Sequence, residues 1–239
     1  MPSPTKSAPP SLTRPVAVIR HATLPYEQAL GMQRQRLDAI QSGSAPDTLY
    51  LLEHPHVYTV GKSAPHNEVL SDSLDDKRIP TVETDRGGRV TYHGPGQLIA
   101  YVLWNLRPLT RDVRGHVERL ESTVMLTLQR IGLHTSRSSR GPGVWINGRK
   151  IAALGVRVRG GVTYHGLSIN RNPDLTCYQG IIPCGMADAP VTSLDDLGCD
   201  LSRTELETLF IESFSEVFHA ETFSEQPQST AGTHKGVDQ

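Results

Sequence analysis

Cys184 is the residue of this sequence best suited to nucleophilic chemistry. Pro183 fixes the backbone before it, and Gly185 adds no side chain after it. Such flanks would present a sulfur to a substrate with a backbone amide close by. A lone cysteine is more often a buried structural residue, and that alternative stays open. Cys177 and Cys199 lack these flanks, and the spacing of the three cysteines fits no zinc-binding pattern, so we expect no metal site.

Lys150 is the second candidate. It follows Asn147-Gly148, the strongest short signal for a β-hairpin, because both residues tolerate positive φ. If the strand after this turn alternates, Lys150 shares a wholly apolar face with every second residue up to Val158. A lysine in an apolar environment is costly unless its charge is used or paired. The alternative is a residue beside the turn whose ammonium group reaches water.

The five letters Val-Thr-Tyr-His-Gly occur twice, at 90–94 and at 162–166, each time just after Arg-Gly-Gly. No further matches recur at this offset, so we favour two strands that face one site over an internal duplication. In a strand, Thr91 and His93 would share one face, as would Thr163 and His165. The neighbouring glycines would let a ligand approach the backbone closely.

The elements that must position these residues can be read from periodicity and turn signals. Helices are expected from Tyr26 to Gly43, over 112–132 and from a capping box at Ser202-Arg-Thr-Glu205. Strands are expected at 16–19, 49–52, 81–83, 91–104 (broken by Gly94-Pro95-Gly96), 144–146 and 150–158. This pattern predicts an α+β fold, with a mixed, largely antiparallel sheet flanked by helices.

Composition limits the classes of function. The chain has 239 residues and a net charge of −1, which argues against nucleic acid or an acidic membrane as a partner. Its apolar runs are too short to span a membrane, and three cysteines indicate a reducing compartment, which we interpret as the cytoplasm. We expect one domain at 15–222 between a disordered leader (1–14) and a disordered tail (223–239).

Five segments together resemble one family. They read "EHPHVYTVGK", "RGGRVTYHGPGQLIAY", "GVWINGRKIAALGVRV", "GLSINRNPDL" and "IIPCGM". In this order they are similar to the octanoyltransferases of lipoate biosynthesis, the lipoyl(octanoyl) transferases. The resemblance covers residues 24–197 and is far more specific than any single motif.

The resemblance implies a fold like the catalytic domain of biotin and lipoate protein ligases. It implies transfer of an octanoyl group from octanoyl-acyl carrier protein, as donor, to a specific lysine of lipoyl-accepting domains. The implied acceptors are the lipoyl domains of 2-oxoacid dehydrogenase E2 subunits and the glycine cleavage H protein.

The resemblance also assigns roles to residues. Cys184 matches the nucleophile that forms an acyl thioester, and Lys150 matches the lysine that lowers the pKa of the thiol. The substrate-binding segments of the family match Arg86, Gly87, Gly88, Arg89, Val90, Thr91, Tyr92, His93, Ala153, Leu154, Gly155, Gly166, Leu167 and Ser168.

The chemistry that follows is an acyltransfer in two halves. Exchange of one thioester for another is nearly balanced in free energy, so it needs no ATP, and we expect no cofactor. Lys150 or a histidine, His93 or His165, would accept the proton of the incoming amine. The backbone amide of Gly185 would be an oxyanion donor.

Three alternatives remain at this point. An ATP-dependent lipoate or biotin-type ligase of the same fold would leave a nucleophilic cysteine without a task. A non-catalytic module that binds lipoyl domains would need neither Cys184 nor Lys150. A thiol hydrolase that uses cysteine and histidine would transfer the acyl group to water instead of to an amine.

Overall fold

A large twisted sheet forms the centre of the protein in this computed structural model, which describes residues 13–65, 67–74, 77–108, 112–139, 141–182 and 190–227. Its strands are, in spatial order, β12 (Ala220–Ser224), β1 (Arg14–Thr23), β2 (Asp47–Glu53), β8 (Gln97–Leu103), β11 (Val162–Asn170), β10 (Arg149–Arg159) and β9 (Gly143–Ile146). β1 runs parallel to both β12 and β2, and the other pairs are antiparallel. The α+β prediction, with a mixed and largely antiparallel sheet, is confirmed.

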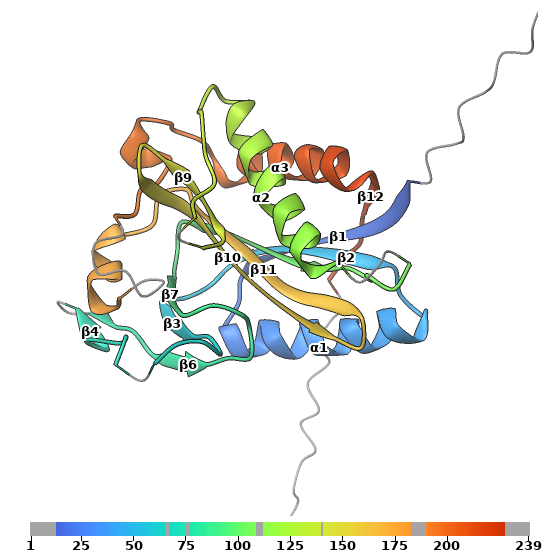
Figure 1. Cartoon of the computed structure of the whole chain (residues 1–239), viewed down its shortest axis with the longest axis horizontal. Coiled ribbons are helices and arrows are strands. Elements are labelled where there is room, and N and C mark those ends of the chain that lie inside the picture. The colour runs from blue at the N-terminus through green and yellow to red at the C-terminus, as the bar shows by residue number, and fades with distance from the viewer. Residues whose placement is uncertain are drawn as a thin grey trace, which may run out of the picture.

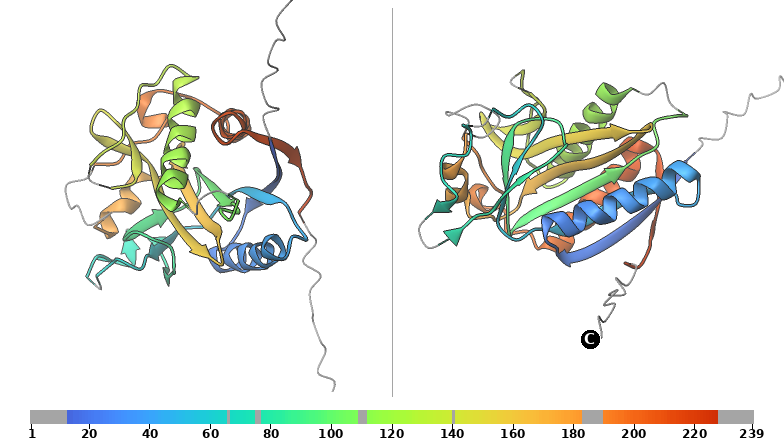
Figure 2. Two further views of the ribbon diagram at one scale, coloured as in Figure 1. Left: turned by 45° about the vertical axis from the view of Figure 1, so that its right-hand side comes forward. Right: turned by 90° about the horizontal axis from the view of Figure 1, so that it is seen from below.

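Helices cover both faces of this sheet (Figure 1). α1 (Tyr26–Ser42) packs against one face through a cluster that includes Leu37, Tyr101 and Tyr164. α2 (Val113–Gln129) and α3 (Arg203–Phe218) cover the other face through the main core, which contains Leu120 and Phe210. The views in Figure 2 show the same arrangement, with α1 on the side away from α2 and α3.

A second, smaller sheet lies at one end of the large one (Figure 1). It consists of β6 (Thr81–Glu83), β3 (Val57–Val60) and β7 (Val90–His93), in that order. A two-stranded ribbon, β4 (Ser73–Leu74) with β5 (Lys77–Arg78), and a 3₁₀ helix at Leu175–Gly180 accompany it. A 3₁₀ helix at Asp195–Leu197 precedes α3.

The local signals in the sequence correspond to these elements. Gly43 ends α1 in the left-handed conformation with φ of +79°, and Asn147-Gly148 forms the hairpin turn with φ of +49° and +77°. The capping box at the start of α3 is present: the Ser202 side chain accepts from the backbone of Glu205, whose carboxylate accepts from the backbone of Ser202.

Two boundaries differ from the sequence prediction. The helix expected over 112–132 is α2 at Val113–Gln129, and Val113 is 40% exposed because it lies in the first turn, directly after the N-cap Asp112. β1 begins at Arg14, and β12 extends across the boundary placed after residue 222. Parallel pairing between these two strands, which joins the ends of the domain, leaves no local signal in either segment. None of the helices in the described part of the chain is long and apolar enough to cross a membrane.

His116 supplies a test of this core. It lies fully buried on α2 against Phe218, and neither of its ring nitrogens has a hydrogen-bond partner among the residues that the structure describes. Burial lowers the pKa of His116 from 6.5 to about 3, with a further contribution from the Arg119 guanidinium. The unfolded chain therefore binds a proton between these two pH values and the folded chain does not, so stability falls as pH falls from about 6.5.

We predict that His116→Leu makes the unfolding free energy less dependent on pH. As the pH falls from 6 to 4, the unfolding free energy of the wild type should decrease by about 1.4 kcal/mol per pH unit more than that of the variant. Urea denaturation at pH 7, 6, 5 and 4 measures both slopes. Equal slopes would show that His116 is not held neutral by the fold.

Candidate active site

A cavity of about 380 Å³ lies between the large sheet and the small one. Its wall combines apolar side chains with glycines that leave the backbone open. The lining residues are Tyr26, Arg86, Gly87, Gly88, Arg89, Val90, Thr91, His93, Tyr101, Val117, Gly141, Pro142, Lys150, Ala153, Leu154, Gly155, Val156, His165, Gly166, Leu167 and Ser168. Of the described residues named from the sequence as catalytic, substrate-binding or auxiliary, all except Tyr92 line this cavity.

The two Val-Thr-Tyr-His-Gly segments reach the cavity from different sheets. The first forms β7 of the small sheet, and the second belongs to β11 of the large sheet. The Arg-Gly-Gly residues before the two segments have different structural roles. Gly87 and Gly88 form a loop on the cavity, whereas Gly160 and Gly161 make the turn between β10 and β11, with φ of +56° and +86°. The repeat in the sequence is therefore not a repeat in the structure.

Tyr92 departs from the sequence assignment. It alternates with Thr91 and His93 along β7, so its ring points away from the cavity. The ring is fully buried in a separate apolar cluster, and its hydroxyl group is 2.8 Å from Nδ1 of His56. Tyr92 supports the small sheet rather than the cavity wall.

Arg86 shapes the loop that covers the cavity. Its buried Nη2 donates to the backbone oxygens of Thr59 and Arg89, both at 2.7 Å, and Nη1 donates to Gly87 O at 3.0 Å. The Gly87 N–H in turn donates to Val156 O of β10 at 3.0 Å. The guanidinium group thus holds the Arg-Gly-Gly loop in a curve that rests on the large sheet.

Lys150 lies on the opposite face of the sheet from the one that simple alternation predicts. It pairs with Trp145 of β9, whereas Ala152 pairs with the adjacent Val144, so one extra residue is inserted in β10. Ile151 and Ala152 both enter the core beneath α2 and α3. This β-bulge turns Lys150 to the face that carries Ala153, away from that core.

The Lys150 side chain is held between a ring, a carbonyl group and a glycine. It is 7% exposed, its Nζ lies 5.0 Å from the centre of the Trp145 ring and it donates to Pro142 O at 3.4 Å. A Cβ at Gly143 would be 2.9 Å from Lys150 Cε, and Gly143 has φ of +152°, so only glycine fits there. The lysine is therefore buried at the cavity and does not extend into water.

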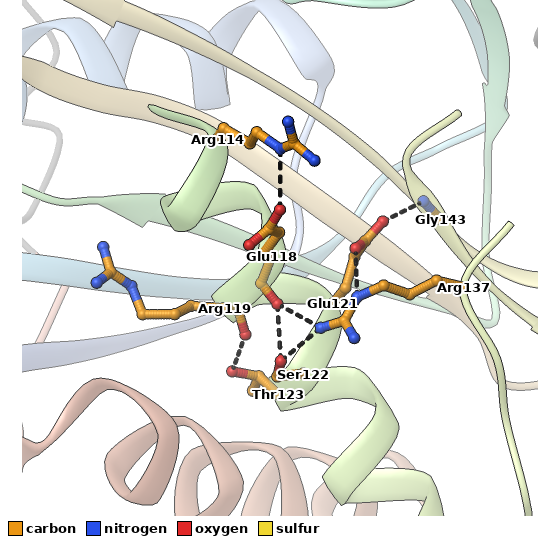
Figure 3. A network of polar contacts seen from close by, with 8 residues as sticks. All are labelled: Arg114, Glu118, Arg119, Glu121, Ser122, Thr123, Arg137 and Gly143. Atoms are coloured by element: carbon orange, nitrogen blue, oxygen red, sulfur yellow. Dashed lines mark hydrogen bonds and ion pairs between the residues drawn. The ribbon is translucent and has the colours of Figure 1, made fainter. Parts of the chain in front are cut away.

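A polar network on α2 fixes this glycine (Figure 3). The buried Glu121 carboxylate accepts from the Gly143 N–H at 3.0 Å and from Arg137 Nε at 2.8 Å. Arg137 also donates through Nη2 to Glu118 O at 2.9 Å. Glu121 therefore connects the helix to the strand that borders Lys150.

His165 has a left-handed backbone inside a strand, with φ of +60°. This conformation is unfavourable for a residue with a side chain and indicates a constraint from the surroundings. It breaks the alternation that the sequence predicts: the Thr163 hydroxyl group donates to Val102 O at 2.9 Å, whereas the His165 ring contacts the Tyr101 ring beside the cavity. Asp85 Oδ1 lies 3.0 Å from His165 Nε2.

Three histidines at or beside the cavity, His165, His93 and His54, are neutral. Burial lowers the pKa of His165 to about 4, against the opposing effect of the Asp85 carboxylate. Burial also lowers the pKa of His93 well below its usual value and that of His54 to about 4. Positive charge at neutral pH is therefore excluded from these three rings.

Cys184 and Gly185 lie outside the described residues. Before them in the chain, the Ile182 N–H donates to Glu68 O at 2.8 Å. The chain after them is paired with the candidate lysine, because the Lys150 N–H donates to Pro190 O at 2.8 Å and Thr192 N donates to Lys150 O at 2.9 Å.

The other two cysteines do not line the cavity. Cys177 is fully buried in the apolar cluster of the small sheet, and burial raises the pKa of its thiol. Cys199 is partly buried against the core beneath α2 and α3. Within the described ranges, no group of three or more His, Cys, Asp or Glu side chains is arranged to hold a metal ion.

Six lining residues were not named as site residues from the sequence: Tyr26, Tyr101, Val117, Gly141, Pro142 and Val156. Tyr26 and Val117 belong to helical stripes that pattern alone assigns to the core. The glycine-rich "RGPGVW" segment carries a signal that could have identified Gly141 and Pro142, because glycines beside a strand allow close approach to its backbone.

Comparisons with known proteins agree on one family. A model of the lipoyl protein ligase A/B catalytic domain matches residues 25–215. The octanoyltransferase of Magnetococcus marinus is 51% identical over 207 residues, which cover 87% of this chain and 95% of that protein. The octanoyltransferase of Paramagnetospirillum magneticum is 42% identical over 208 residues, which cover 85% and 96%.

Solved structures share the fold. A bi-partite lipoate protein ligase from Thermoplasma acidophilum has a TM-score of 0.73 and 18% identity, over 90% of this chain and 88% of that one. Lipoate-protein ligase A bound with ATP has a TM-score of 0.69 and 17% identity, over 91% and 90%. These identities establish the fold alone, which confirms the predicted likeness to lipoate ligases.

We predict that Glu121→Ala destabilises the protein much more than Glu118→Ala, its neighbour one turn earlier on α2. Removal of Glu121 leaves a buried N–H group at Gly143 without an acceptor, which should lower the unfolding free energy by about 1–3 kcal/mol. Glu118 forms an exposed pair with Arg114, so its loss should cost less than about 1 kcal/mol. Urea denaturation of both variants checks this, and similar losses would contradict a special role of the Glu121–Gly143 contact.

Proposed function

This chain belongs to the octanoyltransferases of lipoate biosynthesis, and we propose that it moves an octanoyl group from octanoyl-acyl carrier protein to a lysine of a lipoyl-accepting domain. One observation carries the proposal: a buried lysine ammonium borders a cavity whose wall is mainly apolar, with Arg86, Arg89, His93 and His165 among its polar lining residues. An acyl chain suits such walls, and a cation suits a thioester end where negative charge develops.

The first half-reaction would form an acyl-enzyme. The Cys184 thiolate attacks the thioester carbonyl of the donor, a new C–S bond forms and the thiolate of the carrier leaves. The Lys150 ammonium group stabilises the Cys184 thiolate and then protonates the leaving thiolate. Pairing of Lys150 N–H with Pro190 O, at the return of the chain after Cys184, supports an arrangement in which the two groups cooperate.

The second half-reaction would form the amide. The lysine amine of the acceptor attacks the Cys184 thioester, and the Cys184 thiolate leaves. Lys150, neutral after the first half, accepts a proton from the amine, which restores both groups. We assign this step to Lys150 rather than to His165, because His165 pairs with Val156, six residues beyond Lys150 on β10. The Gly185 N–H remains our proposed oxyanion donor.

The proposed acceptors are lipoyl domains of 2-oxoacid dehydrogenase E2 subunits and the glycine cleavage H protein. The Thermoplasma ligase of the same fold is described in a lipoylation system together with its E2 lipoyl domain, which supports a lipoyl domain as acceptor for this chain as well. We propose a cytoplasmic enzyme without a cofactor, and the roles of the lining residues as substrate contacts are part of the same proposal.

We predict that Cys184→Ala abolishes both acyl-enzyme formation and transfer, whereas Cys177→Ser and Cys199→Ser leave most activity. The two control cysteines are buried or packed against the core, away from the cavity. Intact-mass analysis after incubation with octanoyl-acyl carrier protein, without ATP, detects the thioester. Near-normal turnover by Cys184→Ala would exclude the covalent mechanism.

We also predict that Lys150→Met raises the apparent pKa of the Cys184 thiol. The substitution keeps most of the side-chain volume and removes the cation that favours the thiolate. The pH dependence of alkylation at Cys184, measured by mass in the wild type and the variant, reports this pKa. If the two profiles coincide, another group activates the thiol.

A further inference from the structure

Lys150 marks one end of the cavity on the β9–β10 ladder. Its Nζ lies so close to Gly143 that a Cβ there would be 3.2 Å away. Gly143 pairs with Ala153 across the ladder. The ammonium group therefore lies at the level of Ala153, closer to the middle of β10 than the Cα of Lys150.

The lining residue farthest along β10 is Val156, which pairs with His165 of β11 and lies three residues beyond Ala153. Three residues of a strand span about 10 Å. An extended eight-carbon acyl chain is about 9 Å long, at the usual carbon–carbon bond length. Gly155 and Gly166 pair between these two levels and both line the cavity, and the Arg86 side chain and Gly87 O lie beside Gly155.

His165 is held rigidly at this second level. Its backbone N–H donates to Gln33 Oε1 at 2.7 Å, and Asp85 Oδ1 lies 3.0 Å from its Nε2. Its ring stacks on the ring of Tyr164 with centroids 4.6 Å apart, and Tyr164 also hydrogen-bonds to Asp85. These contacts act on both the backbone and the ring, so methylene groups cannot displace His165 at low cost.

Two further aromatic rings that line the cavity, those of Tyr101 and Tyr26, have hydrogen-bonded hydroxyl groups. The Tyr101 hydroxyl group is 2.7 Å from His54 Nε2, and the Tyr26 hydroxyl group is 3.0 Å from Thr84 Oγ1. The Tyr101 ring meets the His165 ring edge-on at 6.3 Å. The side chains of His165, Tyr101 and Tyr26 are thus each tied by a hydrogen bond at this level of the cavity.

We propose that His165 closes the acyl cavity at the depth of an eight-carbon chain and thereby determines the acyl chain length that the enzyme accepts. This inference rests on the proposed function, because it requires the acyl carbonyl group to lie near Lys150. Asp85 is then a positioning residue, which holds the ring across the end of the cavity. The left-handed backbone at His165 is required, since it turns the ring to this side of the sheet.

The test is a chain-length profile of His165→Gly. Glycine tolerates positive φ and removes the ring, so the variant opens the end wall without backbone strain. Single-turnover acylation is measured by intact mass with hexanoyl, octanoyl, decanoyl and dodecanoyl carrier protein. We expect the decanoyl-to-octanoyl ratio of rate constants to rise on the order of tenfold, the value of about two buried methylene groups. His165→Asn, which is smaller than histidine and tolerates the same backbone, should shift the ratio in the same direction.

His219→Gly is the matched control. His219 is also a histidine with a left-handed backbone, at φ of +52°, but it is exposed at the end of α3 and does not line the cavity. Its substitution should leave the ratio unchanged.

An unchanged ratio in a folded His165→Gly, or an equal loss at all chain lengths, would overturn the inference. Should that variant not fold, the ratio of His165→Asn decides by the same criterion. A wild type that forms no acyl-enzyme with any donor would instead contradict the proposed function.

Discussion

The β-bulge at Ile151–Ala152 decides which side of the large sheet receives Lys150. Without the extra residue, strict pairing along β9 and β10 would direct the lysine into the core beneath α2 and α3, where an unpaired ammonium group is very costly. With it, Lys150 faces a cavity in which a ring, a carbonyl group and a glycine surround its side chain. The Glu121 carboxylate holds that glycine, so the placement of the cation depends on contacts from helix to strand as well as on the strand itself.

The cavity exists because two sheets meet without filling the space between them. The Arg-Gly-Gly loop of the small sheet rests on β10 through the Gly87–Val156 hydrogen bond, and Arg86 keeps the loop curved. A Cβ at Gly155 would lie 2.7 Å from Gly87 O, so the loop can approach the strand only because this residue is glycine. Close backbone contact at this point and glycines along the wall thus leave a cavity of about 380 Å³ between the sheets.

Much of this architecture could be predicted from the sequence, because its signals are local. The hairpin at Asn147-Gly148 and the capping box at Ser202 each act within a few residues, and the resemblance in five segments identified the family. The face of Lys150 was predicted wrongly, since a bulge depends on pairing with β9 and leaves no mark in the alternation of β10. The orientation of His165 was missed for a similar reason: its left-handed backbone goes with contacts to Gln33 and Asp85, which lie far away in the sequence.

Positive charge along the cavity comes from Lys150 and from Arg86 and Arg89 of the loop that covers it, and the Arg86 guanidinium group donates to backbone oxygens. Lys150 supplies a cation at one level of β10, whereas the histidines at the other end are neutral because burial lowers the pKa of each. A thioester carbonyl gains stabilisation only where positive charge is present when negative charge develops on its oxygen. An alkyl chain, in contrast, gains from an apolar wall, and between Ala153 and Val156 it would also pass the Arg86 side chain, which lies beside Gly155. Under the proposed function the thioester carbonyl would lie at Lys150, so the bulge that places Lys150 would also set the direction of the acyl chain.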